Sequence, residues 1–399
     1  MLIFISISLV TVSLLLATPV AVLFLEVVAA IALPRQKFMP TAGGDFSQCI
    51  GVLVPAHNES IGLLSTLEDI QSQLRPADRL LVVADNCTDD TAAVALAAGA
   101  DVRCRDDPDR RGKGYALAWG LQHLQLDPPD IVIIVDADCR LADGTIARLA
   151  EACVITSGPV QALDLMIAPK DAPINYRVME FAWRVKNWVR PLGLQAIGLP
   201  CQLMGTGMAF PWEVIRSADL ASGSIVEDLK LGLDLALAKN PPLFCPSAMV
   251  TSEFPSSVEG VESQRLRWEQ GHIGMILTAT PRLIFKAIQQ ANVNLLALAL
   301  DAAVPPLSLL GTLATGMVAI TGLATSLGVS STALVVSIVS SIGFTGAICL
   351  SWLKFGRDIV PLCDVPSIGS YVIKKLPLYC ILLFRNPGRQ WTRTDRRKV

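Results

Sequence analysis

The sequence predicts an α/β fold with a mostly parallel, Rossmann-like sheet, flanked by transmembrane helices. Between residues 49 and 138, apolar runs of strand length alternate with segments of helical periodicity, a pattern typical of a parallel sheet wound with helices. Residues 1–25 and 302–353 contain no Asp, Glu, Lys or Arg, and a bilayer is crossed by ~20 apolar residues. Hydrophobic residues make up 52% of the 399 and charged residues 17%, at a mean hydropathy of +0.50. This composition is too apolar for a single soluble domain.

The N-terminal apolar stretch is interpreted as a membrane anchor over residues 1–33. A cleaved signal peptide is the alternative, but the run is longer than the apolar core of a signal peptide and has no basic start. Arg35 and Lys37 follow directly. Because positive charge collects on the cytoplasmic side of membranes, the next segment is expected in the cytoplasm.

Strands and helices alternate from this anchor to the middle of the chain. The expected strands are Cys49–Pro55, Arg79–Ala84, Asp101–Cys104 and Ile131–Val135, and the expected helices between them are Ile61–Leu74, Thr88–Ala98 and Gly114–Leu124. The last strand consists of five β-branched residues, as expected of a strand that is buried on both faces of a parallel sheet.

Asp136 and Asp138 stand directly after that strand, where its carboxyl end must lie. Ligands of open α/β sheets bind beyond the carboxyl ends of the strands. Two hard oxygen donors at this point suit Mg²⁺ or Mn²⁺ carrying a diphosphate. The alternative is a strand followed by two solvated aspartates in a turn, because D-x-D is a short and common pattern.

Polar residues also follow the first two strands. His57, Asn58 and Glu59 come after the first strand, and Asp85 comes after the second. Neither G-x-G-x-x-G nor a P-loop occurs in the sequence, so these groups are expected to hydrogen-bond a base and ribose, and Lys113 to meet phosphate. Helix capping by Asn58 is expected as well, but capping does not account for Glu59, Asp85 and Lys113 together.

Three more motifs precede the second apolar stretch. Gly205-Thr206-Gly207 is a run of small residues that lets backbone approach a ligand. Glu227-Asp228 opens a helix, where carboxylates also simply favour the helix dipole. The motif Gln264-Arg265-Leu266-Arg267-Trp268 would mean little by itself. Residues 175–189 form an aromatic-rich helix candidate, for which core packing is expected ahead of a role at the lip of an acceptor site.

The second apolar stretch is expected to hold two transmembrane helices with a break near Gly328. Lys354 and Arg357 close it, and basic residues crowd the C-terminus. Positive charge after the first and last spans predicts one topology: a multi-pass protein of the plasma or inner membrane, with a cytoplasmic domain over residues 34–290, two spans over 291–355 and a cytoplasmic tail over 356–399. In the tail, Ser367–Leu383 is apolar but interrupted by two lysines, which fits a helix lying on the membrane surface.

The charge and cysteine content excludes several classes of protein. The net charge of −2 gives no reason to expect nucleic acid as a partner. Ten cysteines are scattered without a C-x-x-C pair, and three histidines accompany them. A zinc site and a disulfide framework are therefore not expected; reduced thiols in a cytosolic domain are the simplest interpretation.

Together these motifs resemble those of an inverting, membrane-bound glycosyltransferase of family 2 with a GT-A fold. The resemblance covers nearly the whole chain and rests on the order of its motifs between two membrane regions, including D-x-D at 136–138, the acidic pair at 227–228 and Q-x-x-R-W at 264–268. The set is most similar to the processive branch, which includes cellulose, chitin, hyaluronan and poly-N-acetylglucosamine synthases; ceramide glucosyltransferases share much of it. Val226 stands where the family often has Thr, which leaves the base assignment in place but alters a neighbour.

The resemblance implies a role for each matched residue. It implies a donor site formed by Pro55, Ala56, Asn58, Glu59, Asp85, Lys113, Asp136, Gln264, Arg267 and Trp268. Within it, Asp85 pairs with uracil or another base and Lys113 approaches the diphosphate. Asp138, with Asp136, is implied to bind Mg²⁺ or Mn²⁺. Gly205, Thr206 and Gly207 are implied to floor the acceptor site, where Trp268 offers a flat face to a sugar. Asp228 is the implied catalytic base, with Glu227 beside it.

The expected function is transfer of a sugar from a nucleotide-sugar, with UDP as the expected nucleotide, to a glycan or lipid-linked acceptor in polysaccharide synthesis. Because three spans make a thin wall for a polysaccharide channel, export would require a second copy or a partner protein. Single addition to a glycolipid or lipid-linked oligosaccharide is the alternative within the enzyme class. A non-catalytic nucleotide-sugar-binding subunit is more remote, because every expected carboxylate is present. A transporter is disfavoured by the charge-free spans.

Overall fold

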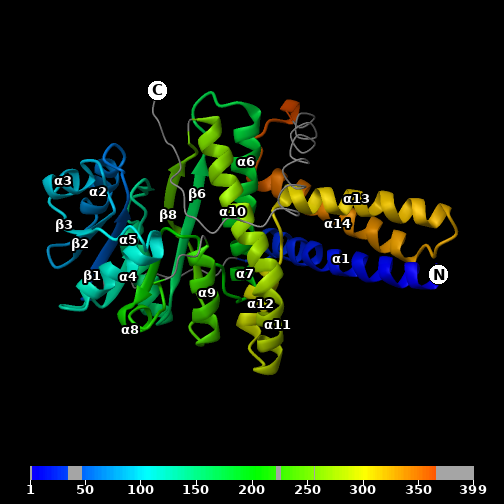
Figure 1. Ribbon diagram of the computed structural model, residues 1–399, viewed down its shortest axis with the longest axis horizontal. Coiled ribbons are helices and arrows are strands. Elements are labelled where there is room, and N and C mark those ends of the chain that lie inside the picture. The colour runs from blue at the N-terminus through cyan, green and yellow to red at the C-terminus, as the bar shows by residue number, and fades with distance from the viewer. Residues whose placement is uncertain (1, 35–46, 222–225, 256, 365–399) are drawn as a thin grey trace.

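The computed structural model describes residues 2–34, 47–221, 226–255 and 257–364 (Figure 1). An α/β domain carries an arm of three long helices that projects to one side. The expected fold class, a mixed α/β domain with a mostly parallel sheet and membrane-length helices, is confirmed. The helix expected over Ser367–Leu383 and the basic tail lie outside the described residues.

In the described part of the chain, eight strands form one sheet in the order β3-β2-β1-β4-β7-β6-β8-β5. The strands are β1 Ile50–Ala56, β2 Arg79–Asp85, β3 Asp101–Arg105, β4 Ile131–Ile134, β5 Arg140–Leu141, β6 Val160–Ile167, β7 Met208–Pro211 and β8 Leu243–Glu253. The four expected strands, β1 to β4, are adjacent and parallel. β7 is antiparallel to both β4 and β6, and β6 is parallel to β8.

Helices cover both faces of this sheet, because its strands are apolar on both sides. α2 Leu63–Gln71, α3 Thr91–Ala97 and α5 Thr145–Thr156 bury their apolar residues against one face. α4 Lys113–Leu124, α8 Trp212–Ile215 and α9 Glu227–Leu237 do so against the other. All four residues of β4 are buried, as its sequence predicts. The carboxyl ends of β1, β2 and β4 therefore open at a common edge.

A second group of helices connects the sheet to the arm. α6 Ile174–Arg184, a π-helical turn η1 Val185–Val189 and α7 Arg190–Ala196 form one continuous segment. α10 Val258–Thr278, α11 Thr280–Gln289 and α12 Val293–Ala302 follow β8. α12 lies in the range expected for the membrane spans, but Leu295 and Leu298 bury it against α9. Residues 293–302 therefore pack on the α/β domain.

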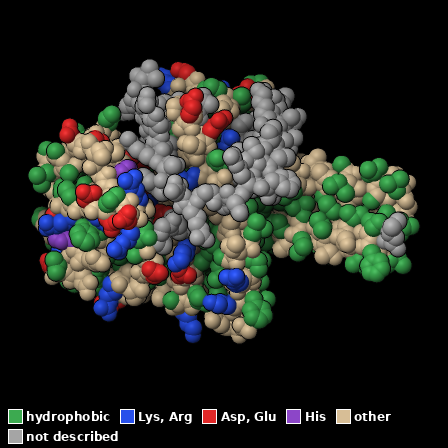
Figure 2. Space-filling view, viewed as in Figure 1, with side chains coloured by type: hydrophobic (Ala, Val, Ile, Leu, Met, Phe, Trp, Pro, Cys, Tyr) green, Lys and Arg blue, Asp and Glu red, His purple; other side chains and the backbone are tan. Residues whose placement is uncertain are grey.

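The arm consists of α1 Leu2–Ala32, α13 Leu307–Ser326 and α14 Thr332–Phe355. Within the described residues, these three helices are long and apolar enough to span a membrane, which suggests membrane association. On the face shown in Figure 2, the arm displays hydrophobic and neutral side chains, whereas charged side chains gather on the α/β domain. α13 and α14 are separated by a short loop in which Gly328 has a φ of +84°, close to the break expected from the sequence. A short 3₁₀ turn, η2 Leu362–Asp364, follows the arm.

The arm is packed tightly onto the domain at the crossing of α1 and α7. A Cβ atom added at Gly193 would lie 1.9 Å from the carbonyl oxygen of Glu26, so only glycine allows this approach. Next to the crossing, Arg190 donates a hydrogen bond from Nε to Glu26 Oε2 at 2.8 Å and forms an ion pair with Asp301 of α12. Glu26, Arg190 and Asp301 are 3%, 5% and 5% exposed, so the three charges depend on one another.

Replacing Arg190 by methionine is expected to destabilise the protein by about 3–5 kcal/mol, because two buried carboxylates lose their only cationic partner among the described residues. Thermal unfolding of the detergent-solubilised chain measures the effect. Adding Glu26→Gln and Asp301→Asn to Arg190→Met should recover most of the loss. Arg216→Met, which breaks an exposed pair with Glu213, should change stability by no more than about 1 kcal/mol. A melting temperature for Arg190→Met equal to that of the unmodified chain would contradict this account.

Candidate active site

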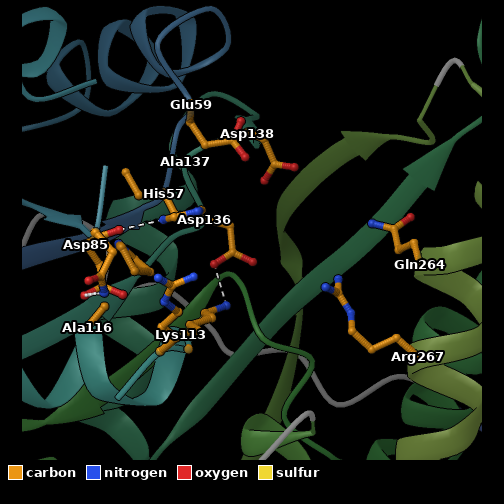
Figure 3. A pocket seen from close by; sticks show the side chains of 15 residues that line it. His57, Glu59, Asp85, Lys113, Ala116, Asp136, Ala137, Asp138, Gln264 and Arg267 are labelled. Carbon is orange, nitrogen blue, oxygen red and sulfur yellow. Dashed lines mark hydrogen bonds and ion pairs between the residues drawn. The ribbon is translucent and has the colours of Figure 1, made fainter. Parts of the chain in front are cut away.

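A solvent-open cleft lies at the carboxyl ends of β1, β2 and β4 and faces α10 (Figure 3). Together with the open solvent at its mouth, the cleft has an empty volume of about 910 Å³. Residues from five separate parts of the chain line it: Pro55, Ala56, His57, Glu59, Asp85, Asn86, Arg111, Gly112, Lys113, Ala116, Asp136, Ala137, Asp138, Gln264 and Arg267. Most of the side chains expected at the donor site are therefore brought together in one cleft.

Asp136 and Asp138 reach this cleft because β4 ends at Ile134 and the chain then turns. The backbone amide of Asp136 donates to the Thr206 hydroxyl at 3.1 Å, which ties this turn to the Gly205–Gly207 loop. The Asp136 carboxylate forms an ion pair with Lys113 (Figure 3). Asp138 and Glu59 line the same cleft.

Lys113 is the cation at the centre of the site. It opens α4 after Gly112, whose φ of +132° favours glycine. Its ammonium donates to the Gly205 carbonyl at 2.8 Å. Burial disfavours the charged amine, but the carboxylates of Asp136, Glu227 and Asp228 outweigh burial and raise the pKa of Lys113 above its ordinary value. Lys113 is therefore a fixed positive charge.

The Gly205–Gly207 loop is held in a conformation that requires its glycines. Gly205 and Gly207 have φ values of +96° and +62°, and a Cβ at Gly207 would lie 2.8 Å from Ala162 Cβ. Gln161 fixes the loop from behind: its amide donates to the Thr206 carbonyl at 2.9 Å and accepts from the Met204 amide at 2.8 Å. The loop is a rigid floor to which Asp136 and Lys113 are both bonded.

Asp228, the expected base, adjoins the same glycine from the start of α9. A Cβ added at Gly205 would lie 3.3 Å from Asp228 Oδ2 and 3.5 Å from Lys113 Nζ, so the two side chains approach one point. Burial raises the pKa of Asp228 above 3.8, although its hydrogen bond from the Leu229 amide and the charge of Lys113 oppose the rise. Burial, and then the charge of Asp228, raise the pKa of Glu227 to about 8.

Glu227→Gln is expected to change how stability depends on pH. The pKa of Glu227 is about 8 in the folded protein against an ordinary 4.5, so the stability contributed by this group is complete below pH 4.5 and is lost as the pH rises through 8. Thermal unfolding without metal or donor should therefore show the variant melting higher than the unmodified chain at pH 9, by at least about 2–4 °C. The difference should shrink toward pH 5. Glu213→Gln, on an exposed side chain of α8, is the matched control, and a constant difference across the pH range would contradict the prediction.

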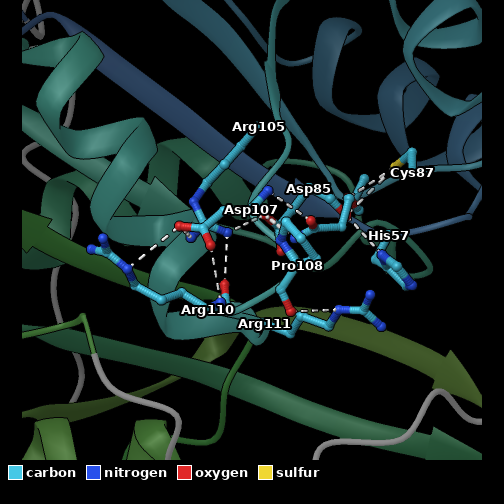
Figure 4. Close-up of polar contacts among 10 residues, drawn as sticks. His57, Asp85, Cys87, Arg105, Asp107, Pro108, Arg110 and Arg111 are labelled. Atoms are coloured by element: carbon cyan, nitrogen blue, oxygen red, sulfur yellow. Dashed lines mark hydrogen bonds and ion pairs between the residues drawn. The ribbon is translucent and has the colours of Figure 1, made fainter.

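Asp85 reaches the cleft with a cationic partner already in place (Figure 4). Its Oδ1 atom accepts from Arg105 Nη1 at 2.6 Å and from Asn86 Nδ2 at 3.0 Å. Arg105 also pairs with Asp107 at 3.0 Å, and His57 Nδ1 lies 2.7 Å from the Asp85 carbonyl oxygen. Both bonds to the Asp85 carboxylate fall on Oδ1, so Oδ2 is the atom on which a ligand would bind.

Two of the residues expected at the donor site, Asn58 and Trp268, do not line the cleft. The residues expected at the acceptor and base positions adjoin it without lining it: Gly205, Thr206, Gly207, Glu227 and Asp228. Asn58 adopts a φ of +55° and exchanges hydrogen bonds with Thr88, at 2.7 Å from the Thr88 amide to Asn58 Oδ1, so it joins the loops after β1 and β2. Trp268 packs on Trp183, with ring centroids 5.0 Å apart. In contrast, Gln264 and Arg267 of the same helix face the D-x-D turn across the cleft (Figure 3).

The structure also brings three polar residues near the site that the sequence analysis did not single out: Asp164, Lys186 and Asn187. Asp164 of β6 is buried and accepts from Asn187 Nδ2 of η1 at 2.9 Å. Burial raises the pKa of Asp164 to about 7, and the charge of Lys186 opposes that rise. The signal in the sequence was a carboxylate within an apolar run, Val160–Ile167, and it becomes interpretable only once that run is known to be a strand.

The carboxylates of the cleft fit a divalent metal whose ligands come partly from the protein and partly from a bound substrate. Within the described residues, no group of three or more His, Cys, Asp or Glu side chains forms a complete cage. Mg²⁺ and similar ions commonly take one or two carboxylates and complete their coordination with phosphate oxygens and water. Asp136 and Asp138, both on the cleft wall, are a donor set of that kind.

Comparison with known proteins gives a match over most of the α/β domain. A family model described as "Glycosyltransferase like family 2" matches residues 47–271, which is more than half of the chain. Glucosyl-3-phosphoglycerate synthase from Mycobacterium tuberculosis strain H37Rv is 37% identical over 95 residues, which are 22% of this chain and 28% of that protein. The same protein from Mycobacterium bovis gives the same figures. The chain thus spans little more than a quarter of these curated relatives.

Among solved structures, the mannosyltransferase PcManGT from Pyrobaculum calidifontis, in complex with GDP-Man and Mn²⁺, aligns with a TM-score of 0.56 at 18% identity. The alignment covers 89% of this chain and 98% of that one, and it shows a common fold, including the helices outside the sheet. The glucosyl-3-phosphoglycerate synthase of M. tuberculosis in complex with Mn²⁺, UDP and phosphoglyceric acid aligns over 50% of this chain and 68% of its own, at 22% identity and a TM-score of 0.33.

Proposed function

The chain belongs to the family described as glycosyltransferase-like family 2, and on that premise we propose that it is a membrane-bound, inverting transferase that moves a sugar from a nucleotide-sugar to a glycan or lipid-linked acceptor. The observation that carries the proposal is the convergence of Asp136, Lys113 and Asp228 around Gly205. Sugar transfer from a diphosphate needs a stabilised leaving group and a base for the attacking hydroxyl. These side chains supply both.

Asp228 takes the role of base in this proposal. A hydroxyl is a poor nucleophile until a carboxylate accepts its proton, and Asp228 is the carboxylate next to the fixed cation Lys113. Lys113 and Arg267, on opposite walls of the cleft (Figure 3), supply positive charge to the leaving diphosphate. Asp85 offers its Oδ2 atom to the base of the nucleotide.

Asp136 and Asp138 would hold Mg²⁺ or Mn²⁺ together with the donor diphosphate. Such an ion neutralises the charge that develops on the leaving group. With an ion bound there, Asp136 would share its carboxylate between the ion and Lys113. The ammonium, which is bonded to the Gly205 carbonyl, would add positive charge beside the phosphates. Structures of PcManGT and of glucosyl-3-phosphoglycerate synthase contain Mn²⁺, which supports the assignment.

The nucleotide is proposed to be UDP, as in the family that the motifs resemble. The related structures carry GDP-Man in one case and UDP-glucose in another. They support a nucleotide-sugar as the class of donor, and sugars linked to UDP and to GDP should both be tested.

Polymer synthesis and single addition remain the two candidate outcomes. The Q-x-x-R-W motif at 264–268 favours a polymer, because it is typical of the processive branch. The arm favours single addition to a lipid-linked acceptor, because three candidate spans among the described residues make a thin wall for a polysaccharide channel. We place polymer synthesis slightly ahead.

The decisive experiment uses the purified full-length chain in nanodiscs with Mn²⁺. A panel of UDP- and GDP-sugars is screened for release of the nucleoside diphosphate, with and without membrane lipid extract, and radiolabelled product is sized on a gel. We expect one donor to be consumed and consumption to require the divalent ion. Absence of donor turnover, or turnover that is indifferent to a chelator, would overturn the proposal. A ladder of long products would indicate polymerisation, and a single band would indicate one addition.

A further inference from the structure

The π-helical turn η1 places a lysine beside the candidate acceptor site. A π turn inserts an extra residue into a helix and is frequent at functional sites. Here the wider turn directs Asn187 onto Asp164 of β6, whereas the neighbouring Lys186 is exposed. Within the described residues, Lys186 has no carboxylate within ion-pair distance.

Aromatic rings hold the lysine next to the expected acceptor platform. The Lys186 ammonium lies 5.1 Å from the centroid of the Trp183 ring, a distance at which a cation is attracted to the ring face. Trp183 in turn packs on Trp268 of the Q-x-x-R-W motif. Lys186 is therefore one ring away from the residue that is expected to contact an acceptor sugar.

The charges around Lys186 leave its ammonium only partly compensated. Desolvation by the surrounding protein lowers the pKa of Lys186, although solvent reaches the side chain, and the charge of Asp228 is the largest opposing influence. Asp164, a buried carboxylate whose charge also acts on Lys186, is already bonded to Asn187. An anionic ligand would complete the partners of this lysine and also screen it from the catalytic carboxylate.

The opposite side of η1 faces the end of a candidate membrane span. Val185 and Val189 are buried in a cluster with residues of α1 and α14. Trp188 packs edge to face on Phe355, the last residue of α14, with centroids 5.3 Å apart. The end of a span lies at the level of the lipid headgroups, so Lys186 lies between that level and the cleft.

We propose that Lys186 binds a phosphate group of the acceptor, and that the acceptor is a lipid that carries this phosphate at the membrane surface. The inference rests on the proposed function and deepens it by naming the class of acceptor. A lysine is a point-charge ligand for phosphate, and the position of this one, between a span end and Asp228, suits a phosphate that is attached to a lipid. Trp183 keeps the ammonium in place when no acceptor is bound.

Binding is measured on the full-length chain in nanodiscs, in the presence of UDP and Mn²⁺, with farnesyl monophosphate, farnesol and glucose 6-phosphate as probes. The unmodified chain should bind farnesyl monophosphate at least tenfold more tightly than farnesol. Lys186→Ala should weaken the binding of farnesyl monophosphate about tenfold, because a hydrogen bond to a charged group contributes about 1.5–3 kcal/mol. Lys186→Arg should stay within about threefold of the unmodified chain. Lys170→Ala, at an exposed lysine in the loop after β6, is the matched control and should bind like the unmodified chain.

Each outcome decides the inference. Equal binding of farnesyl monophosphate by Lys186→Ala and the unmodified chain would overturn it. If glucose 6-phosphate bound tightly in place of the lipid, and this binding required Lys186, the lipid acceptor would be rejected. The acceptor would then be a soluble sugar phosphate. Binding is measured without turnover, so the loss of the phosphate preference in Lys186→Ala does not depend on consumption of a donor sugar. If no donor sugar were consumed, that result would count against the proposed function alone.

Discussion

Asp228→Asn is expected to lower the rate of sugar transfer by about 10²–10⁴-fold, the range that a positioned acid–base group supplies. Asparagine keeps the shape of the side chain but cannot accept the proton of the attacking hydroxyl. The cleft should otherwise be preserved, because the contacts of Lys113 with Asp136 and with the Gly205 carbonyl do not involve Asp228. Initial rates with saturating donor and acceptor measure the effect.

The control for this variant is Asp234→Asn, an exposed aspartate on the same helix that pairs with Lys230. It should transfer sugar at the unmodified rate. The unmodified enzyme should also lose activity on acidification at a pH above the ordinary 3.8 of an aspartate, because the pKa of Asp228 is raised and the base must be ionised to act. Transfer by Asp228→Asn at more than a tenth of the unmodified rate would remove this residue from the role of base.

Asp138→Ala is expected to reduce transfer by roughly 10³-fold or more, since a metal ion contributes several kcal/mol to the stabilisation of a leaving phosphate. Asp138 and Asp136 are the two carboxylates proposed to hold the ion, and Asp136 is also paired with Lys113, so Asp136 alone should hold the ion weakly. Mn²⁺-dependent binding of the nucleoside diphosphate should weaken together with activity. Titration of Mn²⁺ against both readouts measures the two effects.

Asp143→Ala tests whether the effect is specific, because Asp143 is an exposed aspartate in the turn after β5. This variant should keep the Mn²⁺ dependence of the unmodified chain. If Asp138→Ala bound the nucleoside diphosphate with unchanged Mn²⁺ dependence, the metal assignment would fail while the assignment of Asp228 remained open to its own test.

The sequence predicted the parallel half of the sheet well because its strands are continuous apolar runs that end in polar loops. β4 is the clearest case, with every residue buried and the D-x-D turn after it. β6 was missed because Gln161 and Asp164 interrupt its apolar run. Both polar residues are buried and hydrogen-bonded to distant partners, the Thr206 carbonyl and the Asn187 amide, so the tertiary structure compensates a pattern that looked unfavourable locally.

The candidate site divides in the same way. Residues in loops after strands, such as Asp85 and Asp136, were predicted because strand ends meet at one edge of a parallel sheet, and both line the cleft. Lys186 had no such signal, because its relevance depends on a π turn and on a packing partner, Trp183, within the same helix. Trp268 was expected to face a sugar, but its ring packs on Trp183, a contact that depends on the tertiary structure.

The close crossing of α1 and α7 at Gly193, with the Arg190 pairs beside it, has a consequence for how a membrane substrate would be met. A catalytic domain that is joined to its membrane anchor by a flexible linker can change its height and orientation above the bilayer. With the anchor helix in a bilayer, this joint would instead hold the reaction centre at a set height and tilt. Substrates would have to arrive by lateral diffusion in the membrane and present their reactive hydroxyl at that height. The length of the headgroup would therefore determine which lipids can react.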